Sequence, residues 1–241
     1  MLGSAPCTWG RLQLWGIRIP MFDRLKKVFV KGADAASTGA PATPLEQWAR
    51  AMDYVIARKG RTEEFSMTGQ VAGRPFRLDR SAPSRAYIHG HELRARVELD
   101  ADPAVAVMLI NRPLRDALEA KAYENYTDSL QTTLDAGLPE EVRWLAMYDE
   151  VGWETGAVPG FWSRYCTVAD GREHAQAWVD AELMQVLLDW PDATPALPLI
   201  LMLQRGKLYL RMQFTPADLV TLQQVMRLLE QASASAVRPA P

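Results

Sequence analysis

Hydrophobic and polar residues alternate along several stretches of the chain, with the period of two that is typical of β-strands. In residues 93–99 every second residue is apolar, and Arg94 and Arg96 lie between the apolar positions. Residues 64–80 and 197–213 alternate in the same way on both sides of a short turn. We therefore predict that these last two stretches are antiparallel hairpins.

Other stretches show the helical period of 3.6 residues. A capping box around Pro44 predicts a helix over residues 44–59. Residues 161–190 predict two or three helical pieces, and the apolar positions of residues 219–229 form the stripe of a last helix. An unbroken apolar run at residues 104–111 predicts a central strand that is covered on both faces.

The order of these elements indicates the fold class. Strands are grouped in hairpins and do not alternate singly with helices, which argues against a doubly wound sheet. We therefore predict an α+β fold in which helices cover an antiparallel sheet built from hairpins. Residues 93–123 and residues 197–230 both have the order strand, turn, strand, helix, which is a weak sign of duplication. The pattern leaves open whether the strands form one sheet or two.

Residues 44–232 are predicted to form a single domain with a loose segment at each end. Residues 1–43 are expected to be a flexible extension, with a short basic amphipathic helix at residues 21–31 followed by a linker. That helix either contacts an anionic membrane surface, packs on the domain or frays. Met21 is an alternative start of translation, and residues 233–241 are expected to be a disordered tail.

Composition places the chain among soluble globular proteins. Hydrophobic residues make up 48% and charged residues 23% of the 241 positions, which excludes a wholly disordered chain. The sequence contains no apolar run long enough for a membrane span, and no signal-peptide pattern opens it. Its two cysteines are too few for a disulfide scaffold. We therefore expect a cytoplasmic protein.

Charge is distributed unevenly, with a net charge of +6 in residues 1–100 and −8 in residues 101–241. Either the two halves attract each other within one fold, or the first half presents a basic face. Arg94 and Arg96 must share a strand face, and Arg77 joins them if its strand lies opposite. Such a face suits phosphate, RNA or an acidic helix, although the aromatic residues of an RNA-binding sheet are missing beside it.

Aromatic and acidic residues crowd together in residues 144–180. An aromatic cleft would suit a peptide or another partner, and carboxylates between aromatic walls would also suit glycoside hydrolysis. Packing in an ordinary core is the third interpretation. The tryptophans concerned are Trp144, Trp153, Trp162 and Trp178, and the carboxylates include Asp149, Glu150, Asp170 and Glu173.

The sequence carries no established catalytic motif. Cys166 and His174 lie eight residues apart, a spacing that gives no reason to expect a nucleophile and its base. His89 and His91 could share one strand face, but their spacing supplies no third metal ligand, and Gly90 between them indicates a bend. We therefore assign no catalytic residue, no metal and no cofactor.

Two segments resemble a known protein family. The segment Phe161-Trp-Ser-Arg-Tyr-Cys-Thr-Val-Ala-Asp170, with Glu173, Trp178 and Asp180 after it, is followed by Leu201-Met-Leu-Gln-Arg-Gly-Lys-Leu-Tyr-Leu-Arg211. Together they look like an uncharacterised bacterial protein family, and the similarity covers residues 21–232. No activity is assigned to that family. The resemblance implies only a bacterial protein that is cytoplasmic or membrane-peripheral.

With many aromatic residues and no catalytic signature, the sequence favours a non-catalytic protein-interaction or regulatory module with an unidentified protein partner. Two alternatives stay open. One is an enzyme of unrecognised type with its site in residues 144–180. The other is a protein that binds nucleic acid or an anionic membrane through its arginine-rich sheet face and the helix at residues 21–31.

Overall fold

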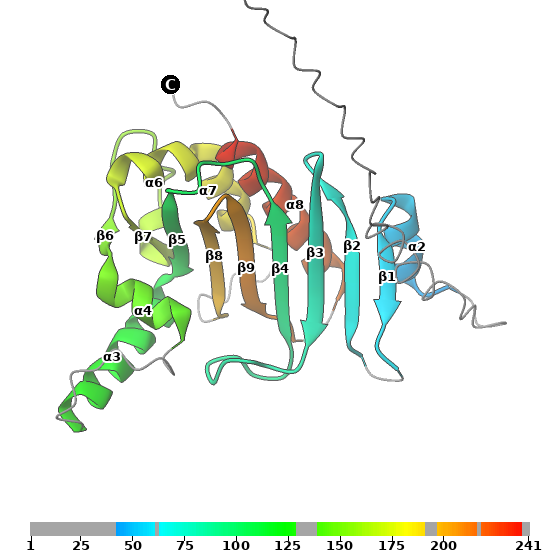
Figure 1. Ribbon diagram of the computed structural model, residues 1–241, viewed down its shortest axis with the longest axis horizontal. Helices are drawn as coiled ribbons and strands as arrows, with labels where there is room; N and C mark the ends of the chain where they lie inside the picture. The colour runs from blue at the N-terminus through cyan, green and yellow to red at the C-terminus, as the bar shows by residue number, and fades with distance from the viewer. Residues whose placement is uncertain (1–41, 61–62, 129–138, 191–196, 216–217, 238–241) are drawn as a thin grey trace, which may run out of the picture. The chain divides into compact units, whose positions relative to one another are not determined.

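The chain forms one antiparallel sheet of nine strands within the residues that we describe (Figure 1). A computed structural model defines residues 42–60, 63–128, 139–190, 197–215 and 218–237. The strand order is β1-β2-β3-β4-β9-β8-β5-β7-β6, and every neighbouring pair is antiparallel. The predicted α+β class is therefore confirmed, and the strands belong to one sheet and not to two.

The strands and helices alternate in groups along the chain. The strands are β1 (Val55–Arg58), β2 (Phe65–Val71), β3 (Arg74–Ser81), β4 (Glu92–Glu98), β5 (Ala106–Asn111), β6 (Asp149–Val151), β7 (Tyr165–Ala169), β8 (Leu199–Gln204) and β9 (Lys207–Gln213). The helices are α2 (Pro44–Ala51), α3 (Arg112–Asp128), α4 (Glu140–Met147), α5 (Phe161–Arg164), α6 (Arg172–Trp178), α7 (Ala181–Leu188) and α8 (Leu219–Ala236).

Both predicted hairpins are present, as β2–β3 and β8–β9. The second hairpin lies between β4 and β5, so these two consecutive strands are not neighbours in the sheet. The two segments that suggested a duplication therefore differ in structure. Residues 197–213 form a hairpin, whereas the strands of residues 93–111 are separated by two others.

One face of the sheet carries the larger hydrophobic core, and we call it the first face. Helices α6, α7 and α8 cover it, and they lie behind the strands in Figure 1. The alternation in β4 matches this arrangement, because Leu93, Ala95 and Val97 point into the core. Leu208, Leu210 and Met212 of β9 do the same, as their spacing predicted.

The second face of the sheet is covered over only part of its width. Helices α3 and α4 pack there, and a smaller core lies beneath them over β5, β7 and β8. Strand β5 thus has a core on both sides, which explains its continuous apolar run. Over β3 and β4 the same face carries exposed side chains, and among the described helices none packs on it (Figure 1). We call this part the open half of the second face.

The predicted helix over residues 44–59 is too long. Its capping box is present, but α2 ends at Ala51, and Val55–Arg58 forms the edge strand β1. Asp53 takes a positive φ of 57°, which stops the helix and turns the chain toward β2. The apolar residues after Ala51 fit a helical period as well as a strand, and pairing with β2 decides between them.

The helical prediction for residues 161–190 is wrong at its centre. Residues Tyr165–Ala169 form β7, which pairs with β5 and β6. All five of its residues are buried, because helices lie on both faces of the sheet at this point. A strand buried on both sides has no polar alternation that could distinguish it from part of a helix.

The last helix continues beyond the predicted end of the domain. α8 extends to Ala236, so residues 233–236 are helical and do not belong to a disordered tail. Small residues allow this extension: Ser233 and Ser235 are buried, and the hydroxyl of Ser235 donates to Asp180 at 2.7 Å. A short segment rich in Ala and Ser has no apolar stripe that would predict a packed helix, so its sequence alone suggested a disordered tail.

The predicted extension at residues 1–41, which includes the basic helix at residues 21–31, lies outside the described residues. Contact with a membrane through that helix therefore stays a prediction. Among the helices that are described, none combines the length and the apolar character that crossing a bilayer requires.

Candidate functional site

Four arginines meet on the open half of the second face. Arg77 of β3 lies directly opposite Arg96 of β4, and Arg94 of β4 lies directly opposite Arg211 of β9. The three predicted arginines are thus brought together on one face. Arg211 was not predicted as a site residue. The alternation of β9 showed that its side chain points away from the core, but only the strand order places β9 beside β4.

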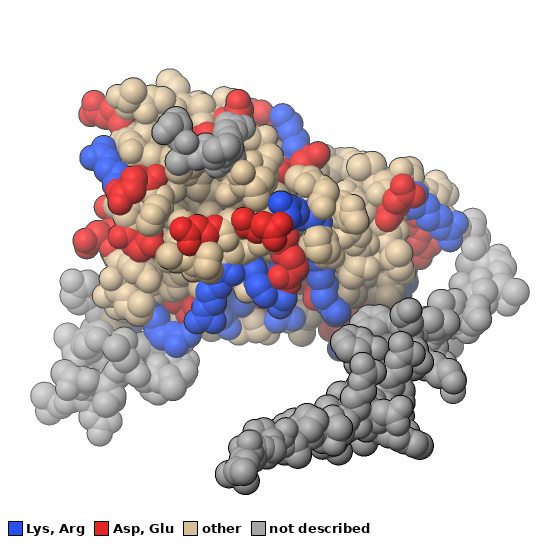
Figure 2. Space-filling model, turned by 45° about the horizontal axis from the view of Figure 1, so that its top comes forward, with Lys and Arg blue, Asp and Glu red and all other residues tan. Residues whose placement is uncertain are grey.

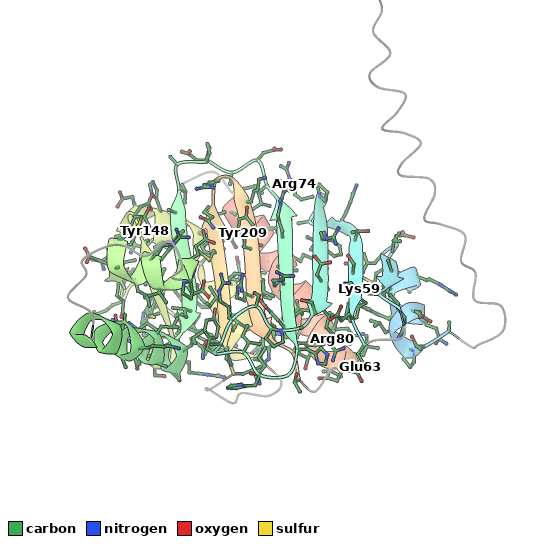
Figure 3. The ribbon with its side chains drawn as sticks, turned by 60° about the horizontal axis from the view of Figure 1, so that its bottom comes forward. Lys59, Glu63, Arg74, Arg80, Tyr148 and Tyr209 are labelled. Atoms are coloured by element: carbon green, nitrogen blue, oxygen red, sulfur yellow. The ribbon has the colours of Figure 1, made fainter. Side chains whose placement is uncertain are left out.

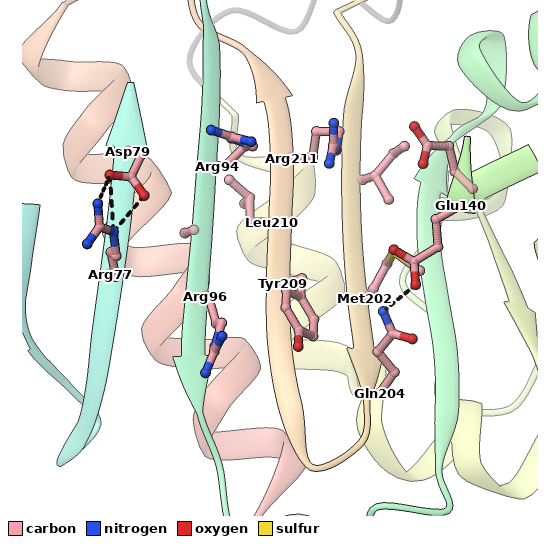
Figure 4. A pocket seen from close by; sticks show the side chains of 13 residues that line it. Arg77, Asp79, Arg94, Arg96, Glu140, Met202, Gln204, Tyr209, Leu210 and Arg211 are labelled. Atoms are coloured by element: carbon pink, nitrogen blue, oxygen red, sulfur yellow. Dashed lines mark hydrogen bonds and ion pairs between the residues drawn. The ribbon is translucent and has the colours of Figure 1, made fainter. Parts of the chain in front are cut away.

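The arginines line a groove with a volume of about 350 Å³, which we call the arginine groove (Figure 4). Its strand side is formed by Arg77, Asp79, Arg94, Arg96 and Arg211. Its helix side is formed by Glu140 and Glu141 of α4 with Gln204 of β8, and its floor includes Ile200, Met202 and Tyr209. The groove therefore has a mainly cationic side, an acidic side and a largely apolar floor between them.

The arginines of the groove differ in their partners. Arg77 forms a two-pronged ion pair with Asp79 at 2.9 Å, and Arg96 forms an ion pair with Glu98. Arg94 donates only a long hydrogen bond of 3.4 Å to the hydroxyl of Ser81. Within the described part of the chain, no carboxylate forms an ion pair with Arg94. This arginine therefore keeps most of its N–H donors available to a ligand.

Arg211 is held in place from below by a buried carboxylate. Its Nη1 lies 2.7 Å from Oε1 of Glu92, whose side chain is 0% exposed. The same nitrogen donates to the hydroxyl of Ser84 at 2.8 Å, and the Ser84 N–H donates to Glu92 at 2.5 Å. Arg211 is therefore fixed in position beside Arg94 before any ligand arrives.

A charged cluster borders the arginine groove through Glu141, which is one of its lining residues. The loop of residues 82–91 joins β3 to β4 and reaches α4, where Nε of Arg85 donates to Glu141 at 2.7 Å and the Tyr87 hydroxyl donates to the same carboxylate. The Glu141 side chain is only 3% exposed. We call Arg85, Tyr87 and Glu141 the loop cluster, and it joins the loop to the helix that forms the acidic side.

The loop cluster shifts the pKa values of its members. Burial raises the pKa of the Glu141 carboxyl, but hydrogen bonds from Arg85 and Tyr87 outweigh burial and hold it below its ordinary value. Burial, followed by the charge of Glu141, raises the pKa of the Tyr87 hydroxyl. At neutral pH the cluster therefore consists of a carboxylate, a guanidinium and a neutral phenol.

Acidification is expected to weaken the fold through this cluster. Because the pKa of Glu141 is lower in the folded state, its contribution is complete above the ordinary carboxyl pKa near 4.5 and is lost as the pH falls through the folded value. Urea denaturation between about pH 7 and about pH 3 measures this loss. Glu141→Gln should lose less stability than the wild type over that range. Parallel curves for the two proteins would show that Glu141 does not carry the effect.

Carboxylates lie among the arginines of the groove, namely Asp79, Glu140 and Glu141. On the face of the molecule drawn in Figure 2, Lys and Arg side chains likewise lie beside Asp and Glu side chains. The predicted basic face is therefore not a continuous cationic surface. Two acidic residues of the second half, Glu140 and Glu141, border the groove beside the arginines of the first half and leave it open.

Not every arginine of these strands belongs to the groove. Arg80 lies on the same strand as Arg77 but points to the first face, where it is 3% exposed. Its Nη2 donates to Glu63 at 2.8 Å, and its guanidinium lies 5.9 Å from the centre of the Phe214 ring (Figure 3). Arg80 is therefore a structural residue at the edge of the larger core.

The four candidate tryptophans are divided between the two cores of the sheet. Trp144 lies in the smaller core beneath α4, whereas Trp153 and Trp178 lie in the larger core on the other face. Trp162 packs edge-on against Trp153 with 4.8 Å between the ring centres. All four take part in packing, and none of them lines the arginine groove. The sheet therefore separates Trp144 from the other three tryptophans.

The carboxylates of the same region lie outside the arginine groove as well. Glu150 is paired with Arg112 at 2.9 Å, and Asp170 is paired with His174 at 2.9 Å. Asp149 and Glu173 are exposed to solvent. The acidic and aromatic cleft within residues 144–180 therefore stays a prediction.

The remaining candidate groups for chemistry are also separated. Burial raises the pKa of the Cys166 thiol to about 12, and Cys166 lies in the smaller core, whereas α6 with His174 packs on the first face. His89 and His91 lie in the loop of the cluster, where Gly90 has the φ of 79° that a bend requires. Among the residues described, no three His, Cys, Asp or Glu side chains are grouped as metal ligands.

Comparison with known proteins assigns no characterised family. No family model matches the sequence, and no curated protein matches it. Among solved structures, the trehalose monomycolate transport factor TtfA of mycobacteria is similar, with 11% sequence identity and a TM-score of 0.44 over 81% of this chain and 94% of that one. Similarity at this level carries no argument about function. The arginine groove is therefore interpreted from its own geometry and chemistry.

Proposed function

We propose that this protein is a non-catalytic interaction module of the bacterial cytoplasm, which holds a segment of a partner protein in the arginine groove. The observation that carries the proposal is the groove itself. It lies on a half-covered sheet face, and its two polar sides flank a floor formed by Ile200, Met202 and Tyr209.

The position of the groove supports this proposal. Helices α3 and α4 cover one part of the second face, and the groove begins where that cover ends. A partner segment lying beside α4 would extend the existing cover across the next strands, which is an ordinary way for two layers to pack. The strands that carry the arginines are central in the sheet, so little reorganisation is needed on binding.

The residue types also favour a protein partner. Arginine, tyrosine and methionine are enriched at protein interfaces, and all three line the groove. A nucleic acid is bound largely through Lys and Arg side chains that neutralise its phosphates. Here Asp79, Glu140 and Glu141 lie among the arginines, so a phosphate backbone would meet repulsion. Mixed charges around an apolar floor suit a protein segment better.

Photocrosslinking from inside the groove tests the proposal. Replacing Tyr209→p-benzoylphenylalanine in the source cells should yield a defined crosslinked protein under ultraviolet light. The same product should be absent when Val220, which is 61% exposed on α8 on the other side of the sheet, carries the crosslinker. It should also disappear when Arg94→Glu and Arg96→Glu are added.

Crosslinking can also contradict the proposal. Products that are the same from Tyr209 and Val220, or that persist after the two charge reversals, would contradict a role for the groove. Circular dichroism of the purified variants distinguishes a lost interaction from a lost fold. Both arginines are exposed, so the reversals should leave the sheet intact.

A further inference from the structure

We propose that the segment held in the arginine groove is acidic, and that one of its carboxylates is bound by Arg94 and Arg211 together. This inference rests on the proposed function and names the chemistry of the partner.

Like charges lie opposite each other on the strand side. Arg94 faces Arg211, and Arg77 faces Arg96, and such directly opposed like charges disfavour sheet pairing. Asp79 and Glu98 offset the charges of Arg77 and Arg96. Among the described residues, Glu92 is the carboxylate that is ion-paired with the pair of Arg94 and Arg211, through Arg211. Asp79 lies directly opposite Arg94 on β3, but its ion pair is with Arg77. A second carboxylate at this pair would balance the remaining charge.

The geometry of the pair suits a carboxylate. Arg211 is fixed by Glu92 and Ser84, and Arg94 has the N–H donors to complete the contact. In Figure 4 the side chains of Arg94 and Arg211 lie at the same level of the groove, on two neighbouring strands. Planar guanidinium groups bind carboxylates through paired hydrogen bonds, which adds direction to the attraction of opposite charges.

The other side of the groove limits the ligand to a segment with few charges. Glu140 accepts a hydrogen bond from Gln204 at 3.0 Å, and Glu141 belongs to the loop cluster. These carboxylates would repel a second anionic group near α4 and would attract an N–H donor. The floor of Tyr209 and Met202 offers an apolar contact between the two sides. The predicted occupant therefore carries a carboxylate next to an apolar side chain.

Fluorescence anisotropy with two matched peptides tests this inference. The probes are a short fluorescein-labelled peptide in which a single Glu lies beside a Phe among uncharged residues, and a counterpart in which that Glu is Gln. At low salt the acidic peptide should bind about tenfold more tightly than the amide peptide. Added salt should weaken binding of the acidic peptide and leave binding of the amide peptide almost unchanged.

Variants of the full chain locate the effect. Arg94→Gln should weaken binding of the acidic peptide about tenfold. Arg94→Lys should weaken it less, because lysine keeps the positive charge but lacks the paired N–H donors of a guanidinium group. Arg227→Gln removes the same charge from an exposed position on α8 and should leave binding unchanged. An equal loss in the Arg94→Gln and Arg227→Gln variants would overturn the inference, since it would show a response to net charge alone.

Two further outcomes separate the inference from the proposed function. If crosslinking at Tyr209 succeeds while both peptides bind with equal affinity, the inference of an acidic segment is wrong, and the proposal of an interaction module is still supported. Tighter binding of a single-stranded oligothymidylate than of the acidic peptide, abolished by Arg94→Gln, would overturn both in favour of a phosphate backbone.

Discussion

Replacing Arg85→Met is expected to lower the free energy of unfolding by about 3 kcal/mol. The Glu141 side chain is 3% exposed and Arg85 is its ion-paired partner, at 2.7 Å. Removal of Arg85 leaves a buried carboxylate with the Tyr87 hydroxyl as its remaining donor within the loop cluster. Urea denaturation followed by circular dichroism measures the loss.

A second variant shows whether an unpaired charge causes that loss. Adding Glu141→Leu to Arg85→Met removes the buried charge and should restore most of the stability, because apolar residues can replace a buried ion pair. Arg143→Met changes an exposed arginine on the same helix and should shift stability by less than about 0.5 kcal/mol. If Arg85→Met and Arg143→Met behave alike, the loop cluster does not hold the loop to α4.

Replacing Trp178→Ala is expected to cost about 4 kcal/mol. Trp178 is 2% exposed in the larger core, where it joins α6 to α8. Its indole N–H donates to the carbonyl of Ala232 at 3.0 Å, at the point where the chain was predicted to leave the domain. The substitution removes the largest side chain in this contact and leaves that carbonyl without its partner. Thermal and urea denaturation both report the loss.

Conservative and exposed changes serve as controls for this tryptophan. Trp178→Phe keeps most of the volume but loses the N–H donor, so we expect a smaller cost of about 1–3 kcal/mol. Gln176→Ala alters an exposed position on α6 and should have little effect. Unchanged stability in Trp178→Ala would contradict a core role and would favour the aromatic cleft that the sequence suggested.

The strand periods predicted much of the arginine groove. A period of two places Arg94 and Arg96 on one face of any strand, whatever lies next to it. The turn between β2 and β3 likewise fixes the position of Arg77 relative to its own hairpin. What the period cannot supply is the neighbour of β4 on its other side. That neighbour, β9, lies more than a hundred residues further along the chain and contributes Arg211 and Tyr209.

Predictions from the sequence were wrong for two kinds of segment: a strand that is apolar on both faces, and a helix end made of small or polar residues. β7 has no alternation because both of its faces are covered, and the end of α8 looks like a tail because its buried residues are Ala and Ser. The crowding of tryptophans in residues 144–180 is real, yet the sheet separates them into two cores. Distance along the chain was a poor guide to distance in space for these residues.

The sequence by itself determined the local elements: the capped start of α2, the hairpins β2–β3 and β8–β9, the apolar stripe of α8 and the outward direction of the arginines. These features depend on residues within a few positions of one another, so the spacing of apolar, polar and capping residues predicts them. The tertiary structure alone decided the insertion of β8–β9 beside β4, the half-covered second face and the pairing of Arg94 with Arg211. Such features depend on contacts between segments that are far apart in the sequence, and the periodicity of a single segment does not predict which other segment will pack against it.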